Sequence, residues 1–165
     1  MICDLRFTIY DCRMAIEITA PGAAGSNHQS SIINHQFIEV SAALIFRNGK
    51  ILITRRHADA HLGGLWEFPG GKREPAETFE QCLARELREE LGVEISVGGL
   101  FDEVTHVYPE KTVRLKFFIC RLEHGEPEPL GCAALKWAAK AELTRYTFPA
   151  ADARLLDQLR AYDFP

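Results

Sequence analysis

Hydrophobic and polar residues follow two different periods once the chain has passed residue 36. Residues 37–46 and 50–56 are rich in β-branched and aliphatic side chains, and Asn48-Gly49 between them is a strong hairpin signal. The same criteria predict strands at 94–97, 100–108, 112–122 and 134–138, with a turn at 109–111 that contains Lys111. This part of the chain is therefore predicted to be rich in paired strands.

The period of an α-helix begins after Thr78. Thr78 and Gln81 have the spacing of a capping box, and Gly92 stands where a left-handed residue ends a helix. A second amphipathic helix is predicted at 150–161. Strands interleaved with two separated helices favour an α/β fold with a mixed sheet between helical layers. The apolar stripe of the first helix consists of Phe79, Cys82, Leu83, Leu87 and Leu91.

Residues 1–36 carry little structural signal. Their last part, 21–36, has the composition of a linker, so we expect an N-terminal extension that is flexible in part. Residues 37–165 then form one domain, in a chain long enough to bury a core. Within this domain, residues 57–70 are expected to be a glycine-rich loop that carries Trp66 and Phe68.

Three carboxylates crowd one face of the first predicted helix. Glu86, Glu89 and Glu90 are three and four residues apart, a spacing that places side chains on a common face. Like charges at this spacing destabilise a helix unless a cation compensates them. Oxygen-only ligation suits a hard ion, Mg²⁺ with Mn²⁺ as a substitute. For these residues alone, a solvated acidic helix face is the simpler interpretation.

Composition and charge exclude several classes of function. The net charge of −4 provides no basic surface for duplex nucleic acid or an anionic membrane. No run reaches the ~18 apolar residues of a membrane span. The five cysteines show no CxxC spacing, so we expect free thiols in a reducing, cytoplasmic setting. Whether the protein is a monomer or a homodimer stays open.

Residues 71–93 reverse the simpler interpretation of the glutamates. Their identities and spacing resemble a complete Nudix box, from Gly71 through Glu77 and the Arg85-Glu86-Leu87 and Glu89-Glu90 groups to Gly92-Val93. The segment ITRRHADAHLGGLWEFPGGK and the late FPAAD extend the resemblance to MutT-type Nudix hydrolases, notably the 8-oxo-dGTP diphosphatases that sanitise the nucleotide pool. The resemblance implies an α/β/α sandwich around a mixed, partly antiparallel sheet.

The resemblance also implies a reaction, metal-assisted attack of water on a nucleoside triphosphate. Glu86, Glu89 and Glu90 would be the side-chain metal ligands, and the Gly70 carbonyl would complete the inner shell. One of the three glutamates would orient the attacking water or take its proton, and family members differ in which one does so. These residues are the predicted catalytic centre.

Other residues of the box are expected to support that centre. Arg85, grouped here with the catalytic residues, would pair with Glu77 and hold the loop against the helix. Gly71 would allow the backbone to approach a ligand closely, and Gly92 would end the helix.

Four residues outside the box are candidates for substrate binding. Arg56, on the second predicted strand, is a phosphate or base contact, or else an exposed strand-end arginine. Phe68 would contact the base, belong to the core, or do both. Lys111 lies where the family often has an arginine near the ligand. Asp152 would read the base edge, or serve as an acid at a helix N-terminus.

The chain departs from the family at one position. Many relatives carry a metal-binding Glu about six residues before a tryptophan that corresponds to Trp137, and Gly131 occupies that place here. Glu126 and Glu128 are near in sequence, and either is a candidate replacement if the loop follows a different path.

The leading hypothesis is a Mg²⁺-dependent enzyme that hydrolyses oxidised purine nucleotides such as 8-oxo-dGTP, in nucleotide sanitisation linked to DNA repair. Its nearest rival acts on CTP or modified dCTP. An ADP-ribose-type pyrophosphatase is a minor alternative, because Pro109 lies 16 residues after Val93. The alternative of another class is a non-catalytic Nudix nucleotide-binding or sensor module. In every case the expected partner is a small nucleotide.

Overall fold

The structure is a computed structural model that describes residues 36–165. The N-terminal extension predicted from the sequence lies outside the described residues, except Gln36, which opens the first strand. The elements are β1 (Gln36–Arg47), β2 (Lys50–Arg55), β3 (Trp66–Glu67), β4 (Gly70–Lys72), α1 (Phe79–Leu91), β5 (Glu94–Val107), β6 (Lys111–His124), β7 (Ala134–Ala139), the 3-10 helices η1 (Lys140–Arg145) and η2 (Ala150–Asp152), and α2 (Ala153–Ala161).

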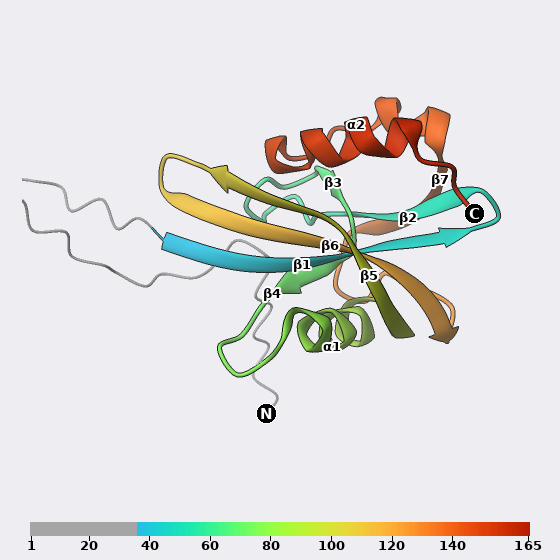
Figure 1. The fold of residues 1–165 in the computed structure, drawn as a ribbon, viewed down its shortest axis with the longest axis horizontal. Coiled ribbons are helices and arrows are strands. Elements are labelled where there is room, and N and C mark those ends of the chain that lie inside the picture. Colours follow the sequence, from blue (N-terminus) through green and yellow to red (C-terminus); the bar gives the residue numbers. More distant parts are fainter. Residues whose placement is uncertain (1–35) are drawn as a thin grey trace, which may run out of the picture.

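The described chain forms a seven-stranded mixed sheet between two helical layers. Its main path runs β3-β2-β1-β6-β5, while β4 pairs with β1 and β7 pairs with β2. The long β1–β6 pair is parallel, and the other pairs are antiparallel. Figure 1 shows α1 on one face of the sheet and α2 on the other. The predicted α/β/α sandwich around a mixed, partly antiparallel sheet is confirmed.

Each helix covers its own apolar core. Leu83, Leu87 and Leu91 of α1 pack on one face of the sheet, as the helical stripe predicts. Leu155 and Leu159 of α2 pack on the opposite face. Strand β1 contributes alternate residues to both cores, because successive side chains of a strand point to opposite faces. The central strands are thus buried on both sides, which holds the loops at their ends rigidly in place.

The predicted hairpin and helix caps are present. Asn48 and Gly49 both have positive φ, 51° and 70°, as a two-residue hairpin turn requires. The Thr78 side chain accepts a hydrogen bond from the Gln81 backbone N–H, and Gln81 reciprocates. Gly92 ends α1 in the left-handed conformation at φ 68°. These local signals were readable because each depends on only a few neighbouring residues.

Four boundaries differ from the sequence prediction. The expected loop at 57–70 contains β3 and the first residue of β4, because pairing with β2 and β1 orders it. The two strands expected at 94–97 and 100–108 are one strand, β5, whose bulges absorb the glycines between them. Lys111 is not in a turn but opens β6. The helix expected at 150–161 begins with η2 before α2.

Candidate active site

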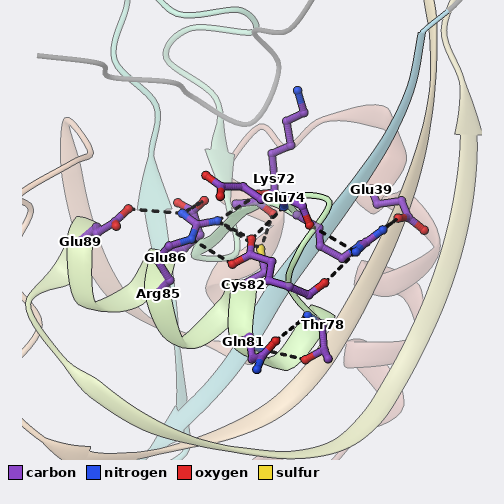
Figure 2. Close-up of polar contacts among 12 residues, drawn as sticks. Glu39, Lys72, Glu74, Thr78, Gln81, Cys82, Arg85, Glu86 and Glu89 are labelled. Atoms are coloured by element: carbon purple, nitrogen blue, oxygen red, sulfur yellow. Dashed lines mark hydrogen bonds and ion pairs between the residues drawn. The ribbon is translucent and has the colours of Figure 1, made fainter. Parts of the chain in front are cut away.

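Arg85 ties the loop before α1 to the helix. Its guanidinium contacts both oxygens of Glu77, at 2.7 Å through Nη2 and 3.1 Å through Nε. Nη2 also donates to the Lys72 carbonyl at 3.2 Å, as Figure 2 shows. The Arg85 hydrogen bonds are the main reason that the pKa of Glu77 is lowered. The Arg85–Glu77 pair expected from the sequence is therefore present.

Glu86 points back toward the loop and is held by the same arginine. Its Oε1 lies 2.7 Å from Arg85 Nη1, and the residue is only 8% exposed. Burial raises the pKa of Glu86, while Arg85 opposes that rise. A Cβ placed on Gly71 would lie 2.0 Å from Glu86 Cδ, so the absence of a side chain at residue 71 makes room for this carboxylate. Gly71 thus has a second steric function beyond the backbone freedom expected of it.

Gly70 is constrained by backbone rather than by a side chain. A Cβ there would lie 2.0 Å from the Ser41 carbonyl oxygen on the paired strand β1. The two neighbouring glycines therefore serve different purposes: Gly70 permits the close β1–β4 approach, and Gly71 accommodates Glu86.

The remaining two box glutamates complete an acidic cluster. Glu89 lies 3.4 Å from Arg85 Nη1 with a side chain that is 61% exposed. The pKa of Glu90 is raised well above its usual value, first by burial and then by the negative charges of Glu86, Glu67 and Glu89. Repulsion among these negative charges is unfavourable unless a cation compensates it.

The convergence of the glutamates is nevertheless incomplete. Within residues 36–165, no three His, Cys, Asp or Glu side chains are grouped closely enough to hold a metal ion as they stand. The physical reason is that like charges separate, and Arg85 acts as counter-ion to Glu86 and Glu89. The donor set still fits a hard divalent ion: carboxylate oxygens on adjacent helix positions, two of them with raised pKa values that a cation would reverse.

Glu67 was missed by the sequence interpretation. It lies on β3 between Trp66 and Phe68, which drew attention to the aromatic pair instead. Burial raises its pKa, and it forms a 2.8 Å ion pair with Arg56. Glu67 lines the same recess as Asp152, and its negative charge also contributes to the raised pKa values of Glu90 and Asp152. A charged residue in an otherwise apolar triplet beside the glycine pair was the available signal.

Arg56 is not the exposed strand-end arginine of the alternative expectation. It follows the last residue of β2, and its side chain is only 1% exposed, so it is no solvent-facing strand end. Besides its ion pair with Glu67, its Nε donates to the His61 carbonyl at 2.8 Å. Arg56 therefore supports the recess through Glu67, and direct contact with substrate stays a prediction.

A narrow recess on the α2 face brings together two of the predicted substrate residues. Phe68 and Asp152 both line it, beside Glu67 and Phe117. Phe68 is also buried core, packed against Phe148 at a centroid distance of 5.4 Å. Burial raises the pKa of Asp152 well above its usual value. Although Asp152 is at the N-terminus of α2, its side chain makes no capping hydrogen bond.

Lys111 lies outside this set of recess residues. It is 3% exposed, and its Nζ lies 3.2 Å from His61 Nε2. Strand alternation gives it the same face as Leu115 and Phe117, which line the recess further along β6. Its substrate role also stays a prediction.

The loop that replaces the family's late glutamate packs on the end of α1. The backbone N–H groups of Leu130 and Gly131 both donate to the Glu90 carbonyl at 2.9 Å. A Cβ on Gly131 would lie 2.9 Å from Glu90 Cγ, so the counted position is beside the acidic cluster but has no carboxylate. Glu126 instead forms a bidentate pair with Arg47, at 2.8 and 2.6 Å, and Glu128 is exposed. The Glu128 backbone N–H donates to the Leu91 carbonyl at 3.0 Å, so its backbone lies at the end of α1, but no hydrogen bond or ion pair among residues 36–165 joins either carboxylate to a box glutamate.

The sandwich, the box loop and the acidic cluster define a class of protein, and comparison with known families agrees. The chain belongs to the Nudix hydrolase family: the NUDIX domain model matches residues 41–158. The resemblance to MutT-type enzymes drawn from the sequence is confirmed. No helix in the described part of the chain has the length and apolarity that crossing a membrane requires.

Individual relatives carry different names. The CTP pyrophosphohydrolase of Escherichia coli K12 is 40% identical over 126 residues, covering 76% of this chain and 93% of that protein. The 8-oxo-dGTP diphosphatase of the same organism is 36% identical over 113 residues, covering 68% and 88%. The solution structure of the E. coli ORF135 protein is 39% identical, with a TM-score of 0.67 over 77% of this chain and 91% of that one. The crystal structure of MutT from Methanosarcina mazei Go1 is 25% identical, with a TM-score of 0.70 over 77% and 95%.

Proposed function

We propose that this enzyme uses Mg²⁺, or Mn²⁺ in its place, to hydrolyse a nucleoside triphosphate to a nucleoside monophosphate and pyrophosphate. The observation that carries the proposal is that Glu67, whose charge opposes the ionisation of Glu90, also lines the recess with Phe68 and Asp152. A triphosphate on the cluster and its base in the recess would then belong to one molecule.

The acidic side chains have distinct tasks in the proposed mechanism. Glu86, Glu89 and Glu90, with the Gly70 carbonyl, would hold the divalent ion, which neutralises phosphate charge and makes bound water more acidic. Arg85 keeps Glu86 beside the Gly71 backbone. A glutamate next to the water orients it or accepts its proton.

Asp152 supports the leading substrate, 8-oxo-dGTP. Its raised pKa favours the carboxylic acid, which offers one O–H donor and one acceptor. Guanine presents two acceptors, N7 and O6, on that edge. 8-Oxoguanine carries N7–H beside O6, a donor and an acceptor that match the acid. The same acid would discriminate against guanine, because guanine has no N–H on this edge to donate to the acceptor oxygen of the acid.

The second candidate substrate is CTP or a modified dCTP. Cytosine presents the N4–H₂ donor beside the N3 acceptor, which a carboxylic acid at Asp152 matches equally well. The 40% identical CTP pyrophosphohydrolase supports this candidate. Both substrates therefore fit one recognition scheme, and measurement must rank them.

The test is pyrophosphate release from 8-oxo-dGTP, dGTP, CTP and methylated dCTP under Mg²⁺ and Mn²⁺ titration, with AMP formation from ADP-ribose measured in parallel. Equal kcat/KM for 8-oxo-dGTP and dGTP would remove the oxidised-purine proposal and leave the class. Glu89→Gln should reduce kcat roughly 10²–10⁴-fold while nucleotide binding persists. Glu80→Gln, an exposed position in the first turn of the same helix, is the matched control. A wild-type protein that binds nucleotides and turns none over would establish the sensor alternative.

A further inference from the structure

Asp102 is a buried carboxylate that the proposed mechanism does not use. It lies on β5 next to a register irregularity, and its side chain is 5% exposed. Its Oδ1 accepts from the Glu103 backbone N–H at 2.9 Å, while its Oδ2 is buried without a hydrogen-bond partner among residues 36–165. A buried carboxylate needs a compensating cation, because an unpaired buried charge is strongly destabilising.

Arg154 of α2 supplies that cation. Its Nη2 lies 2.9 Å from Asp102 Oδ1, although the arginine side chain is 62% exposed. An arginine in the first turn of a helix opposes the helix dipole, and the first turn of α2 contains no acidic residue. Asp102 therefore compensates Arg154 as much as Arg154 compensates Asp102. The ion pair joins β5 to the start of α2.

The start of α2 is also the element that carries Asp152. Arg154 follows Asp152 by two residues, and η2 leads directly into α2. On the other side of the ion pair, Asp102 is the register partner of Phe117, a wall of the base recess. The ion pair thus connects the strand pair behind the recess to the turn that brings Asp152 into it. No capping bond of its own side chain fixes Asp152 there.

We propose that Asp102 is a positioning residue for base selection: through Arg154 it fixes the η2–α2 turn so that Asp152 lies in the recess beside Phe68. The inference rests on the proposed function of Asp152 and extends it to a pair outside the recess. Among residues 36–165, no hydrogen bond or ion pair joins Asp102 or Arg154 to Glu86, Glu89 or Glu90. Loss of the Asp102–Arg154 ion pair should change which base is accepted and leave the rate of phosphoanhydride hydrolysis intact.

The experiment compares Asp102→Asn and Arg154→Gln with the wild type. Asp157→Asn is the matched control, because Asp157 forms an exposed 2.7 Å ion pair with Arg160 on the same helix. We expect each variant to raise KM for the preferred nucleotide about tenfold and to reduce its preference over the next substrate roughly fivefold, with kcat within about twofold. Asp157→Asn should change none of these values.

The double variant tests whether the two residues act as one unit. Because each single change already breaks the pair, Asp102→Asn/Arg154→Gln should be no worse than the more affected single variant. Additive losses, or a lower melting temperature with an unchanged preference ratio, would overturn the proposal and leave a purely structural tether. Arg154→Gln alters an exposed side chain, so it keeps the test available if Asp102→Asn does not fold.

Failure of the proposed function gives a different result. If the wild type releases no pyrophosphate from any nucleotide, the enzymatic proposal fails. The positioning role is then tested by calorimetry. The Kd values for 8-oxo-dGMP, dGMP and CMP are measured in the wild type and in both variants, and each is divided by the Kd of the nucleotide that the wild type binds most tightly. An unchanged ratio in those titrations refutes the role of Asp102 independently of turnover.

Discussion

Gly71→Ala separates the fold of the box from its chemistry. The new Cβ would lie 2.0 Å from Glu86 Cδ and 2.3 and 2.4 Å from its oxygens. Ordinary contact begins at 3.4 Å, so the carboxylate must move by about 1.4 Å. These atoms are the end of a flexible side chain, so the fold can adapt; we expect a loss of about 1 kcal/mol in unfolding free energy. Because a misplacement of ~1 Å at the reacting centre can reduce a rate 10²-fold, kcat should fall about 10²-fold.

The assay combines pyrophosphate release under saturating Mg²⁺ with thermal unfolding of the same samples. Two glycines provide the controls. A Cβ on Gly99 meets nothing within 4 Å, so Gly99→Ala should retain both rate and melting temperature. A Cβ on Gly70 meets the Ser41 carbonyl at 2.0 Å, and backbone cannot swing away, so Gly70→Ala should lower the melting temperature severely. For Gly71→Ala, the melting temperature should fall by only about 3 °C.

Two results would refute this reasoning. A Gly71→Ala enzyme with wild-type kcat would show that the Glu86 position against residue 71 is irrelevant to the reaction. A Gly71→Ala protein that unfolds as readily as Gly70→Ala would show that the carboxylate cannot move aside. The first outcome contradicts the role of Glu86, and the second contradicts the steric account of the box glycines.

Three further predictions concern the charged groups. Arg85 lowers the folded pKa of Glu77, so Glu77→Gln should cost about 2 kcal/mol at neutral pH; in pH-dependent melts the difference should shrink as pH falls below 4.5 and vanish below the lowered folded pKa. The pKa values of Glu86 and Glu90 are raised, so the metal-free chain loses stability as pH rises through them. A fixed Mg²⁺ concentration equal to 100 times the Kd at pH 8 should therefore stabilise the protein by about 2.7 kcal/mol at pH 8, and by much less at pH 5, where protonated carboxylates raise that Kd. Asp152→Asn keeps a donor and an acceptor, so the ratio of kcat/KM between the preferred and the competing nucleotide should be preserved. Asp152→Ala should reduce that ratio roughly 5- to 150-fold.

The parts predictable from sequence are those whose physics is local. The capping box at Thr78, the left-handed Gly92 and the Arg85–Glu77 pair each depend on residues within one short segment. The helix positions of the box glutamates can be predicted for the same reason. The contacts of Arg85 with Glu86 and Glu89 cannot be predicted from this spacing. Sequence spacing specifies the helix face, but the rotamers follow from the balance of charges in three dimensions.

The recess could not be predicted as a unit because its walls come from distant segments. Glu67 and Phe68 follow the second hairpin strand, Phe117 lies on β6, and Asp152 precedes α2. The burial of Arg56 likewise depends on its long-range partners, Glu67 and His61. Resemblance to a family selected Phe68 and Asp152, but it did not indicate Glu67, which connects the recess to the acidic cluster.

The connection through Glu67 has an energetic consequence for how substrate and metal bind. Glu90, Glu67 and Asp152 all have raised pKa values, because burial and mutual repulsion oppose their ionisation. A triphosphate entering this acidic site without a cation would add further repulsion. A divalent ion reverses the sign of that interaction for both the carboxylates and the phosphates. Metal and nucleotide must therefore strengthen each other's binding, by the same factor in either order of addition.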